Sequence, residues 1–197
     1  MPRVLLTAFE PYDRWKANSS WLALVHLTQH LPDHPQITTR LYPIDFLAMK
    51  EQLAADLSSK FAYVLHLGQA PGSSRIQLEA IGLNIGGSSS QSPDQYRALT
   101  DDGPVAYLSE LPLSEWAVKL RRGGIPAQVS YHAGTYLCNA TLYWSHYLAC
   151  KMSLPTRSAF IHLPLDISQV VNEPHGTASL PATVSANAVR CILEELT

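Results

Sequence analysis

Short apolar runs alternate with segments of helical periodicity along this chain. The runs at residues 3–9, 61–68 and 157–165 have the length and composition of buried strands, and residues 36–44, 74–85 and 125–132 also look extended. Helical spacing marks residues 19–31, 46–60, 113–124 and 181–196, with another helix after Cys138, and Ser19 or Ser20 is a plausible N-cap for the first helix. This alternation favours an α/β fold, with a largely parallel or mixed sheet covered on both faces.

The length of the chain fits one domain. Its 197 residues can bury a substantial core, and the sequence contains no internal repeat, domain linker or coiled coil. We therefore expect residues 1–197 to form a single domain.

Composition excludes several classes of partner. The net charge is −2 and Lys and Arg form no cluster, so we expect no binding to nucleic acid. No run approaches the roughly 20 apolar residues of a membrane span, and the first apolar run is too short for a signal peptide. Three cysteines without framework spacing favour free thiols in a reducing compartment, so we expect a cytoplasmic protein. Only 15% of the residues are charged, which leaves room for a self-association surface.

Cys138 is the first candidate for chemistry. It follows a turn that contains glycine and precedes a predicted helix. Backbone N–H groups at a helix N-terminus favour a thiolate and can stabilise an oxyanion when an acyl group is attacked. The alternatives are a buried small hydrophobic residue, which is common for free cysteine, or a metal ligand.

His162 and Glu79 could complete a nucleophilic site. His162 ends an apolar strand, and 24 residues separate it from Cys138 (162 − 138), a reasonable distance for adjacent strands joined by a crossover helix. Glu79 lies in an otherwise apolar stretch and needs a partner, which could be the imidazole. A histidine satisfied within the core, and a carboxylate paired with Arg75 or facing solvent, are the structural alternatives.

A metal site has little support. His146 and Cys150 lie four residues apart on one helix, but the sequence has no C-x-x-C pair, and zinc sites usually show tighter ligand pairing. We expect neither a metal nor another cofactor.

Several motifs together resemble the pyroglutamyl peptidase I family of cysteine peptidases, also called pyrrolidone-carboxylate peptidases. The similarity runs nearly end to end, and the segment GIPAQVSYHAGTYLCN, which contains Cys138, matches the family's cysteine motif closely. LGQAPGSSRIQLEAIGLN is similar to the glutamate motif, and FIHLP matches the histidine motif. The opening motif is matched through Thr7, Phe9, Pro11, Asn18, Ser20 and Trp21.

The resemblance implies a Cys–His–Glu triad and one α/β/α domain. Cys138 would be the nucleophile, His162 the general base and acid, and Glu79 the carboxylate that orients the imidazole. The reaction would remove an N-terminal pyroglutamyl (5-oxoproline) residue from peptides through a thioester acyl-enzyme. Homo-oligomers, either dimers or tetramers, are frequent in this family.

The same resemblance implies a pocket that recognises a neutral lactam. Such a pocket should be apolar and aromatic, with a few polar groups for the lactam N–H and C=O. By position, the substrate-binding candidates are Phe9, Tyr12, Gln69, Tyr136 and Leu137.

The chain departs from the family pattern near the expected substrate. Tyr12 replaces a phenylalanine, Asp13 and Arg14 replace two glycines, and Gln77 stands where a small hydroxyl residue is usual. The loop at residues 86–92 is rich in Gly and Ser where the family tends to carry acidic residues and an arginine, so we expect it to be flexible. A catalytically weak or inactive relative that binds a lactam or peptide N-terminus is therefore the alternative function.

Overall fold

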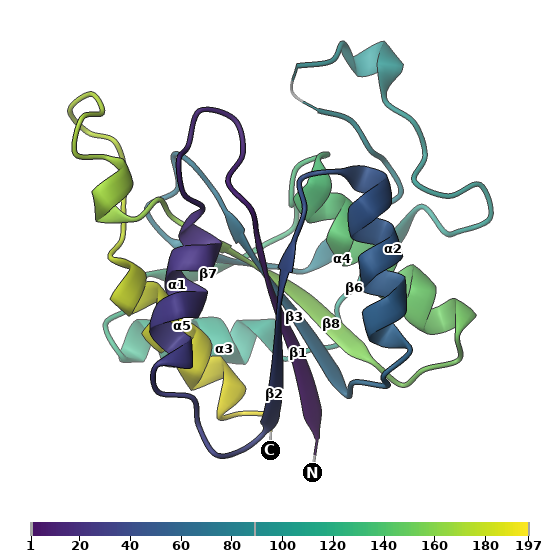
Figure 1. Ribbon diagram of the computed structural model, residues 1–197, viewed down its shortest axis with the longest axis horizontal. Helices are drawn as coiled ribbons and strands as arrows, with labels where there is room; N and C mark the ends of the chain where they lie inside the picture. Colours follow the sequence, from purple (N-terminus) through teal and green to yellow (C-terminus); the bar gives the residue numbers. More distant parts are fainter. Residues whose placement is uncertain (1, 89, 197) are drawn as a thin grey trace.

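The computed structural model describes residues 2–88 and 90–196. Six strands form one sheet in the order β2-β1-β3-β8-β4-β7 (Figure 1). Their bounds are Arg3–Phe9 (β1), Gln36–Tyr42 (β2), Tyr63–Gln69 (β3), Ile76–Glu79 (β4), Ala127–Ser130 (β7) and Arg157–Leu163 (β8). β4 pairs antiparallel with β8 and parallel with β7, so this pair runs against the other four strands. The sheet is mixed and largely parallel, which confirms the prediction from the sequence.

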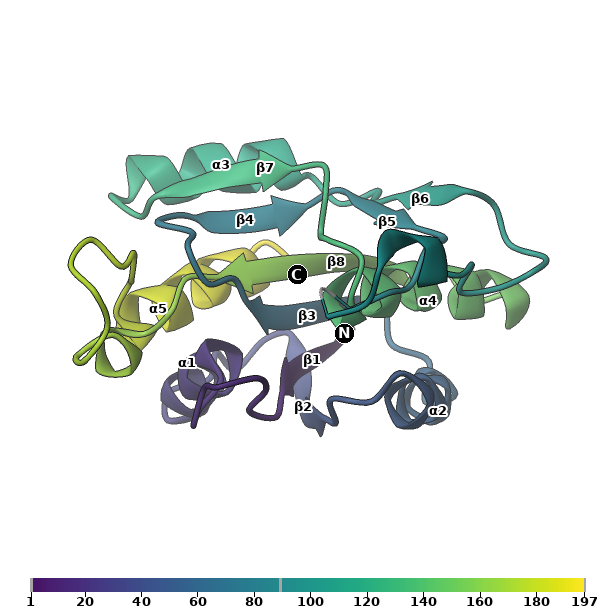
Figure 2. The same ribbon diagram turned by 90° about the horizontal axis from the view of Figure 1, so that it is seen from above.

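Helices cover both faces of the sheet. Figure 2 shows α1 (Ser19–Thr28), α3 (Leu113–Arg122) and α5 (Ala182–Leu193) on one side, and α2 (Phe46–Leu57) and α4 (Leu137–Lys151) on the other. The central strands β1, β3 and β8 are buried along almost their whole length, because each packs against helices through both faces. The predicted three-layer α/β/α architecture is therefore confirmed.

Two predictions of local geometry were wrong. β7 and β8 are not adjacent, because β4 lies between them. The first residue of α1 is Ser19, and its N-cap is Asn18 rather than Ser19 or Ser20. The Asn18 side chain accepts a hydrogen bond from the Ser20 N–H at 3.0 Å, as an N-cap residue does.

A second, two-stranded sheet and two short 3₁₀ helices complete the described elements. β5 (Ile81–Leu83) pairs antiparallel with β6 (Ala106–Leu108). The sequence did not predict β6, because three residues are too few to show a period. The 3₁₀ helices are η1 (Pro93–Gln95) and η2 (Ile167–Gln169), and η2 lies in the segment that follows β8.

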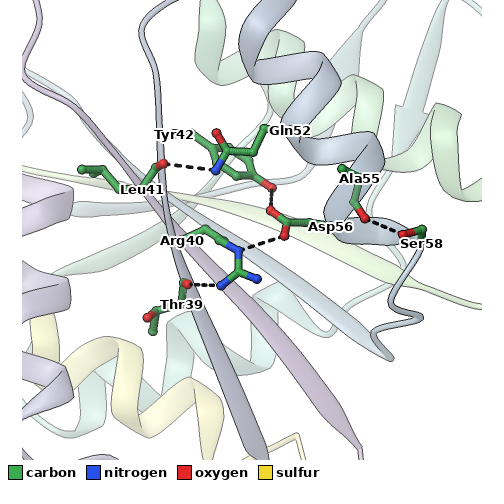
Figure 3. Close-up of polar contacts among 8 residues, drawn as sticks. All are labelled: Thr39, Arg40, Leu41, Tyr42, Gln52, Ala55, Asp56 and Ser58. Atoms are coloured by element: carbon green, nitrogen blue, oxygen red, sulfur yellow. Dashed lines mark hydrogen bonds and ion pairs between the residues drawn. The ribbon is translucent and has the colours of Figure 1, made fainter.

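Hydrogen bonds and an ion pair connect the edge strand β2 to α2 (Figure 3). Asp56 of α2 accepts hydrogen bonds from Arg40 Nε at 2.9 Å and from the Tyr42 hydroxyl at 3.1 Å. Burial, and the Asp56 carboxylate beside it, raise the pKa of Tyr42, so the phenol remains protonated and donates. These contacts hold an edge strand whose outer side pairs with no other described strand.

Candidate active site

His162 and Glu79 are brought together by the antiparallel pairing of β4 and β8. Glu79 lies opposite Phe160 in this pair, so its side chain reaches diagonally to His162 on the same face of the sheet. Glu79 Oε1 is 2.7 Å from His162 Nδ1. Both residues are buried, and Glu79 has no exposed surface.

Within the described residues, the His162 imidazole is the only hydrogen-bond partner of the Glu79 carboxylate. Oε2 of Glu79 is buried and has no hydrogen-bond partner within the described part of the chain. A buried carboxylate without further donors is favourable only beside a positive charge, so this arrangement favours the protonated imidazole. With Nδ1 engaged by Glu79, Nε2 of His162 is free to meet the thiol of Cys138.

Cys138 belongs to α4, and its side chain lies beside the His162 ring. Burial lowers the pKa of the His162 ring, but the Cys138 thiolate and the Glu79 carboxylate outweigh this effect and raise the pKa to about 10. Cys138 is the second residue of α4, and the side chain of the N-cap residue, Tyr136, makes no capping bond. The N–H groups of the first helical turn are therefore not capped by Tyr136 and can face an anion at the thiol.

Glycine at position 68 makes room for this arrangement. Gly68 is the register partner of His162 in the parallel pair of β3 and β8. A Cβ atom at this position would lie 2.4 Å from Phe160 Cζ and 3.2 Å from Cys138 Sγ. Only a residue without a side chain lets Phe160 and Cys138 lie this close to β3.

A cavity of about 320 Å³ opens beside Cys138. Its wall includes Cys138 and all five predicted substrate-binding residues, which are Phe9, Tyr12, Gln69, Tyr136 and Leu137. Burial, with the Cys138 thiolate adding to it, raises the pKa of Tyr12 to about 12, so its hydroxyl is a donor at neutral pH. The cavity is largely apolar and aromatic, with a small number of polar groups, which is the character that the family resemblance implies.

Other residues of the cavity wall were missed by the sequence analysis: Asn18, Ile44, Tyr96, Ala133, Gly134 and Thr135. Asn18 belongs to the opening motif, and Ala133, Gly134 and Thr135 belong to the cysteine motif, so the motifs could have indicated these four. Tyr96 lies in a segment where the sequence showed no signal for chemistry.

Hydrogen bonds hold the first residues of the loop at residues 86–92 in place. Gly87 N–H donates to Thr135 O at 2.8 Å, and Thr135 Oγ1 donates to Gly87 O at 3.2 Å. Gly86 forms an isolated bridge with Arg97, and the Tyr96 hydroxyl donates to Ser88 O at 3.2 Å. The two glycines are thus fixed to the turn before Cys138 and to the segment that carries Tyr96, while Ser89 lies outside the described residues.

The described residues include no cluster of three or more His, Cys, Asp or Glu side chains that could hold a metal ion. His146 and Cys150, the pair weighed as ligands, instead line a different surface pocket, in which the His146 ring stacks on Tyr107. Among the described helices, none has the length and apolar character needed to cross a membrane.

Comparison with known proteins gives a consistent result. The family model described as "Pyroglutamyl peptidase" matches residues 2–197. The pyrrolidone-carboxylate peptidase of Erwinia tasmaniensis is 34% identical over 93% of this chain and 88% of that relative. The one from Thermococcus onnurineus is 31% identical over 95% of this chain and 96% of that relative. Among solved structures, the pyrrolidone carboxyl peptidase of Fervidobacterium islandicum superposes with a TM-score of 0.93 at 32% identity, covering 100% of this chain and 98% of that one.

Proposed function

Because this chain belongs to the pyroglutamyl peptidase family, we propose that it is a cysteine peptidase that removes N-terminal pyroglutamate from peptides. The observation that carries the proposal is the contact of His162 with Glu79, 2.7 Å apart, next to a cysteine in the wall of a largely apolar cavity. Residues 1–197 act as one peptidase domain.

In the first half of the reaction, the Cys138 thiolate attacks the carbonyl carbon of the pyroglutamyl residue. The backbone N–H groups at the start of α4 stabilise the resulting oxyanion. The protonated His162 gives its Nε2 proton to the nitrogen of the leaving peptide, and the C–N bond breaks. A thioester between Cys138 and the pyroglutamyl group remains, and the shortened peptide leaves.

In the second half, water attacks the thioester and His162 accepts a proton from it. The C–S bond breaks, free pyroglutamate is released, and the thiolate and the imidazolium are restored. Glu79 keeps the imidazole oriented through Nδ1 and favours its charged form in both halves.

The cavity supports recognition of a lactam, which has no ammonium group. Phe9, Tyr136 and Leu137 supply apolar surface, and Tyr12 and Gln69 supply polar groups for the ring amide. Three free cysteines support a reducing compartment, and we assign the protein to the cytoplasm on this ground. Its partners are peptides that begin with pyroglutamate, and a second copy of the chain in a dimer or tetramer.

The test is the release of a fluorescent amine from L-pyroglutamyl-7-amido-4-methylcoumarin under reducing conditions, beside Cys138→Ala. Turnover by the wild type alone supports both the activity and the nucleophile. No turnover by a folded, reduced protein would favour the alternative, a weak or inactive relative that binds a lactam or peptide N-terminus. The rate of Cys138 alkylation then separates the two, because an activated thiolate reacts fast and loses this reactivity in His162→Ala.

A further inference from the structure

Arg14 and Glu173 form an ion pair that the proposed reaction does not use. Arg14 lies in the loop after β1 and Glu173 in the loop after β8, and because both strands run parallel to β3, the two loops leave the same edge of the sheet (Figure 1). The contact is bidentate: Nη2 of Arg14 donates to Oε2 of Glu173 at 2.7 Å, and Nη1 donates to Oε1 at 3.1 Å. The pair therefore joins two loops whose residues lie 159 positions apart in the sequence.

Arg14 belongs to a tight turn that begins at a residue of the cavity wall. The Trp15 N–H donates to Tyr12 O at 3.2 Å, so Asp13 and Arg14 are the two central residues of a four-residue turn. Tyr12, the first residue of the turn, lines the cavity beside Cys138. A contact that fixes Arg14 therefore fixes the turn that places the Tyr12 side chain in the cavity wall.

The backbone of this turn is strained. Asp13 has a φ of +54°, in the left-handed region, which costs free energy for residues other than glycine, although aspartate tolerates it better than most. Such conformations persist where surrounding contacts hold them. Two contacts do so here: the ion pair with Glu173, and the Arg14 guanidinium, which lies 4.4 Å from the centroid of the buried Trp15 ring.

Glu173 lies on a segment that is itself anchored. Its N–H donates to Val170 O at 3.0 Å, in the turn that follows η2, and Gln169 of η2 donates to Ala17 O at 2.9 Å. The Glu173 side chain is 17% exposed, against 61% for Arg14. The carboxylate is thus the more buried member of the pair, and the rest of the fold sets the place at which Arg14 binds it.

We propose that Arg14, through its ion pair with Glu173, is a positioning residue that holds Tyr12 in the wall of the substrate cavity. Tyr12 forms and breaks no bond in the reaction, so its placement strengthens binding equally in the ground state and the transition state. The inference rests on the proposed function, because the pyroglutamyl group is the occupant assigned to the cavity there. It adds two residues, outside the cavity wall, that set the affinity of the site.

The experiment compares the wild type, Arg14→Gln, Glu173→Gln and the double variant on the pyroglutamyl coumarin amide. Each single substitution breaks the ion pair, and we expect KM to rise about threefold with little change in kcat, since a partly exposed ion pair contributes modestly. The double variant should have a KM no higher than the single variants, because the pair is lost only once. An unchanged KM, additive effects, an effect of Arg14→Gln alone, or a fall in kcat at constant KM would overturn the inference.

A Tyr12→Ala background tests whether the ion pair acts through Tyr12. With the ring removed, nothing remains to be positioned, so Glu173→Gln should leave the KM of this background unchanged. A rise of about threefold here too would mean that the pair acts by another route, against the inference.

Salt gives a readout that a general loss of stability does not. The coumarin amide is uncharged, so salt screens no attraction between substrate and enzyme, but it does weaken the ion pair of the wild type. The difference in KM between the wild type and Glu173→Gln should therefore shrink from about 0.05 M to about 0.5 M NaCl. A difference that stays constant would contradict the role of the ion pair.

Lys119→Gln is the matched control. It removes an ion pair with Glu195, between α3 and the residues after α5, and neither partner lines the cavity. KM should equal that of the wild type at every salt concentration. A rise as large as that of Glu173→Gln would overturn the inference, because the loss of an ion pair remote from Tyr12 would then have the same effect.

A binding readout separates this inference from the activity itself. 2-Pyrrolidone, an uncharged lactam, should protect Cys138 of the wild type from iodoacetamide, and Glu173→Gln should need about threefold more of it. Equal protection in the two proteins would overturn the inference and leave the peptidase function standing. No protection of the wild type would overturn the lactam assignment of the cavity, and the inference with it. Thermal unfolding verifies the fold of each variant, and either single variant decides the question if the other does not fold.

Discussion

Glu79 lies opposite Phe160, not His162, and reaches the imidazole diagonally across the antiparallel pair of β4 and β8. The contact joins residues 83 positions apart in the sequence. It therefore depends on the register of two short strands, and a change in the Glu79 side chain tests its role without disturbing the pairing.

Glu79→Gln should leave the protein folded and lower kcat by roughly 10²-fold or more, because replacing the orienting carboxylate of a triad by an amide can cost up to about 10⁴-fold. The amide keeps a hydrogen-bond acceptor for Nδ1 but lacks the charge that favours the imidazolium. Steady-state kinetics on the pyroglutamyl coumarin amide, with circular dichroism as the folding control, measures the effect. A kcat within threefold of the wild type would exclude Glu79 from the mechanism.

The His162 ring should titrate near pH 10 in the free enzyme. Burial alone would lower its pKa, and the Cys138 thiolate and Glu79 carboxylate raise it to about 10. The pKa should fall in Cys138→Ala, where the thiolate is absent. NMR titration of the ring ¹Hε1 resonance checks both statements, and a wild-type midpoint near 6.5 would contradict them.

The same shift predicts how stability depends on pH. The folded pKa lies above the unfolded value of about 6.5, so the stabilisation from protonated His162 is complete below pH 6.5 and is lost as the pH rises through about 10. The stability difference between the wild type and His162→Gln should therefore shrink from pH 7 to pH 10. Urea unfolding of both proteins across this range measures it, and a constant difference would be evidence against the raised pKa.

Gly68→Ala should lower both stability and activity. Its Cβ would lie 2.4 Å from Phe160 Cζ, and overpacking of this kind typically costs about 1–3 kcal/mol. Gly123→Ala is a suitable control, since Gly123 is exposed and a Cβ there makes only ordinary contacts. Urea midpoints and kcat/KM of the two variants give the comparison, and equal values would show that the space around Cys138 is not restrictive.

Gly87→Ala should displace Tyr96 from the cavity wall and raise KM. A Cβ at Gly87 would lie 2.1 Å from Tyr96 Cδ1, and the ring must move to relieve this overlap. In a Tyr96→Ala background the same glycine substitution should have little further effect, because no ring remains to be displaced. A double-mutant cycle on KM and on the thermal midpoint measures the coupling, and additive effects would refute it.

Asp56→Ala should destabilise the fold by about 2 kcal/mol, because the buried Tyr42 hydroxyl loses its acceptor. Asp56→Asn keeps an acceptor oxygen and should lose less. Urea unfolding of the two variants supplies the measurement. Equal destabilisation would mean that the charge of Asp56, rather than the satisfied Tyr42 hydroxyl, holds β2 to α2.

The sequence was sufficient to predict the fold class and the family, but not the strand order. Apolar periodicity is a local property, and it located β1, β3 and β8 within a few residues. Nothing local indicated that β4 would insert, antiparallel, between β8 and β7. The expectation that Cys138 and His162 follow adjacent strands therefore failed, although the two residues do meet.

The prediction of the site relied on motifs, and two of the residues that it missed, Ile44 and Tyr96, lie outside every motif. Cys138, His162 and Glu79 each belong to a motif of the family, and the family model confirms that resemblance. Their catalytic roles remain predictions until the variants are assayed. Tyr96 could not be found in this way, because it lies outside the motifs and packs on Gly87 in a segment where the sequence shows no signal for chemistry.

The antiparallel insertion of β4 has a consequence for how the protein folds. β4 lies between β8 and the edge strand β7, and it supplies the carboxylate for a histidine 83 residues away. Contacts between residues so far apart in the sequence form slowly. Closing the loop between them lowers the entropy of the chain before the strand pairing contributes any stabilisation. The pairs between β3 and β8 span even more of the chain, 94 residues from His66 to Phe160 (160 − 66). His162 and its carboxylate therefore both depend on long-range closure of the sheet around β8. The rate of Cys138 alkylation during refolding should report this closure, because the thiol is activated only beside its histidine.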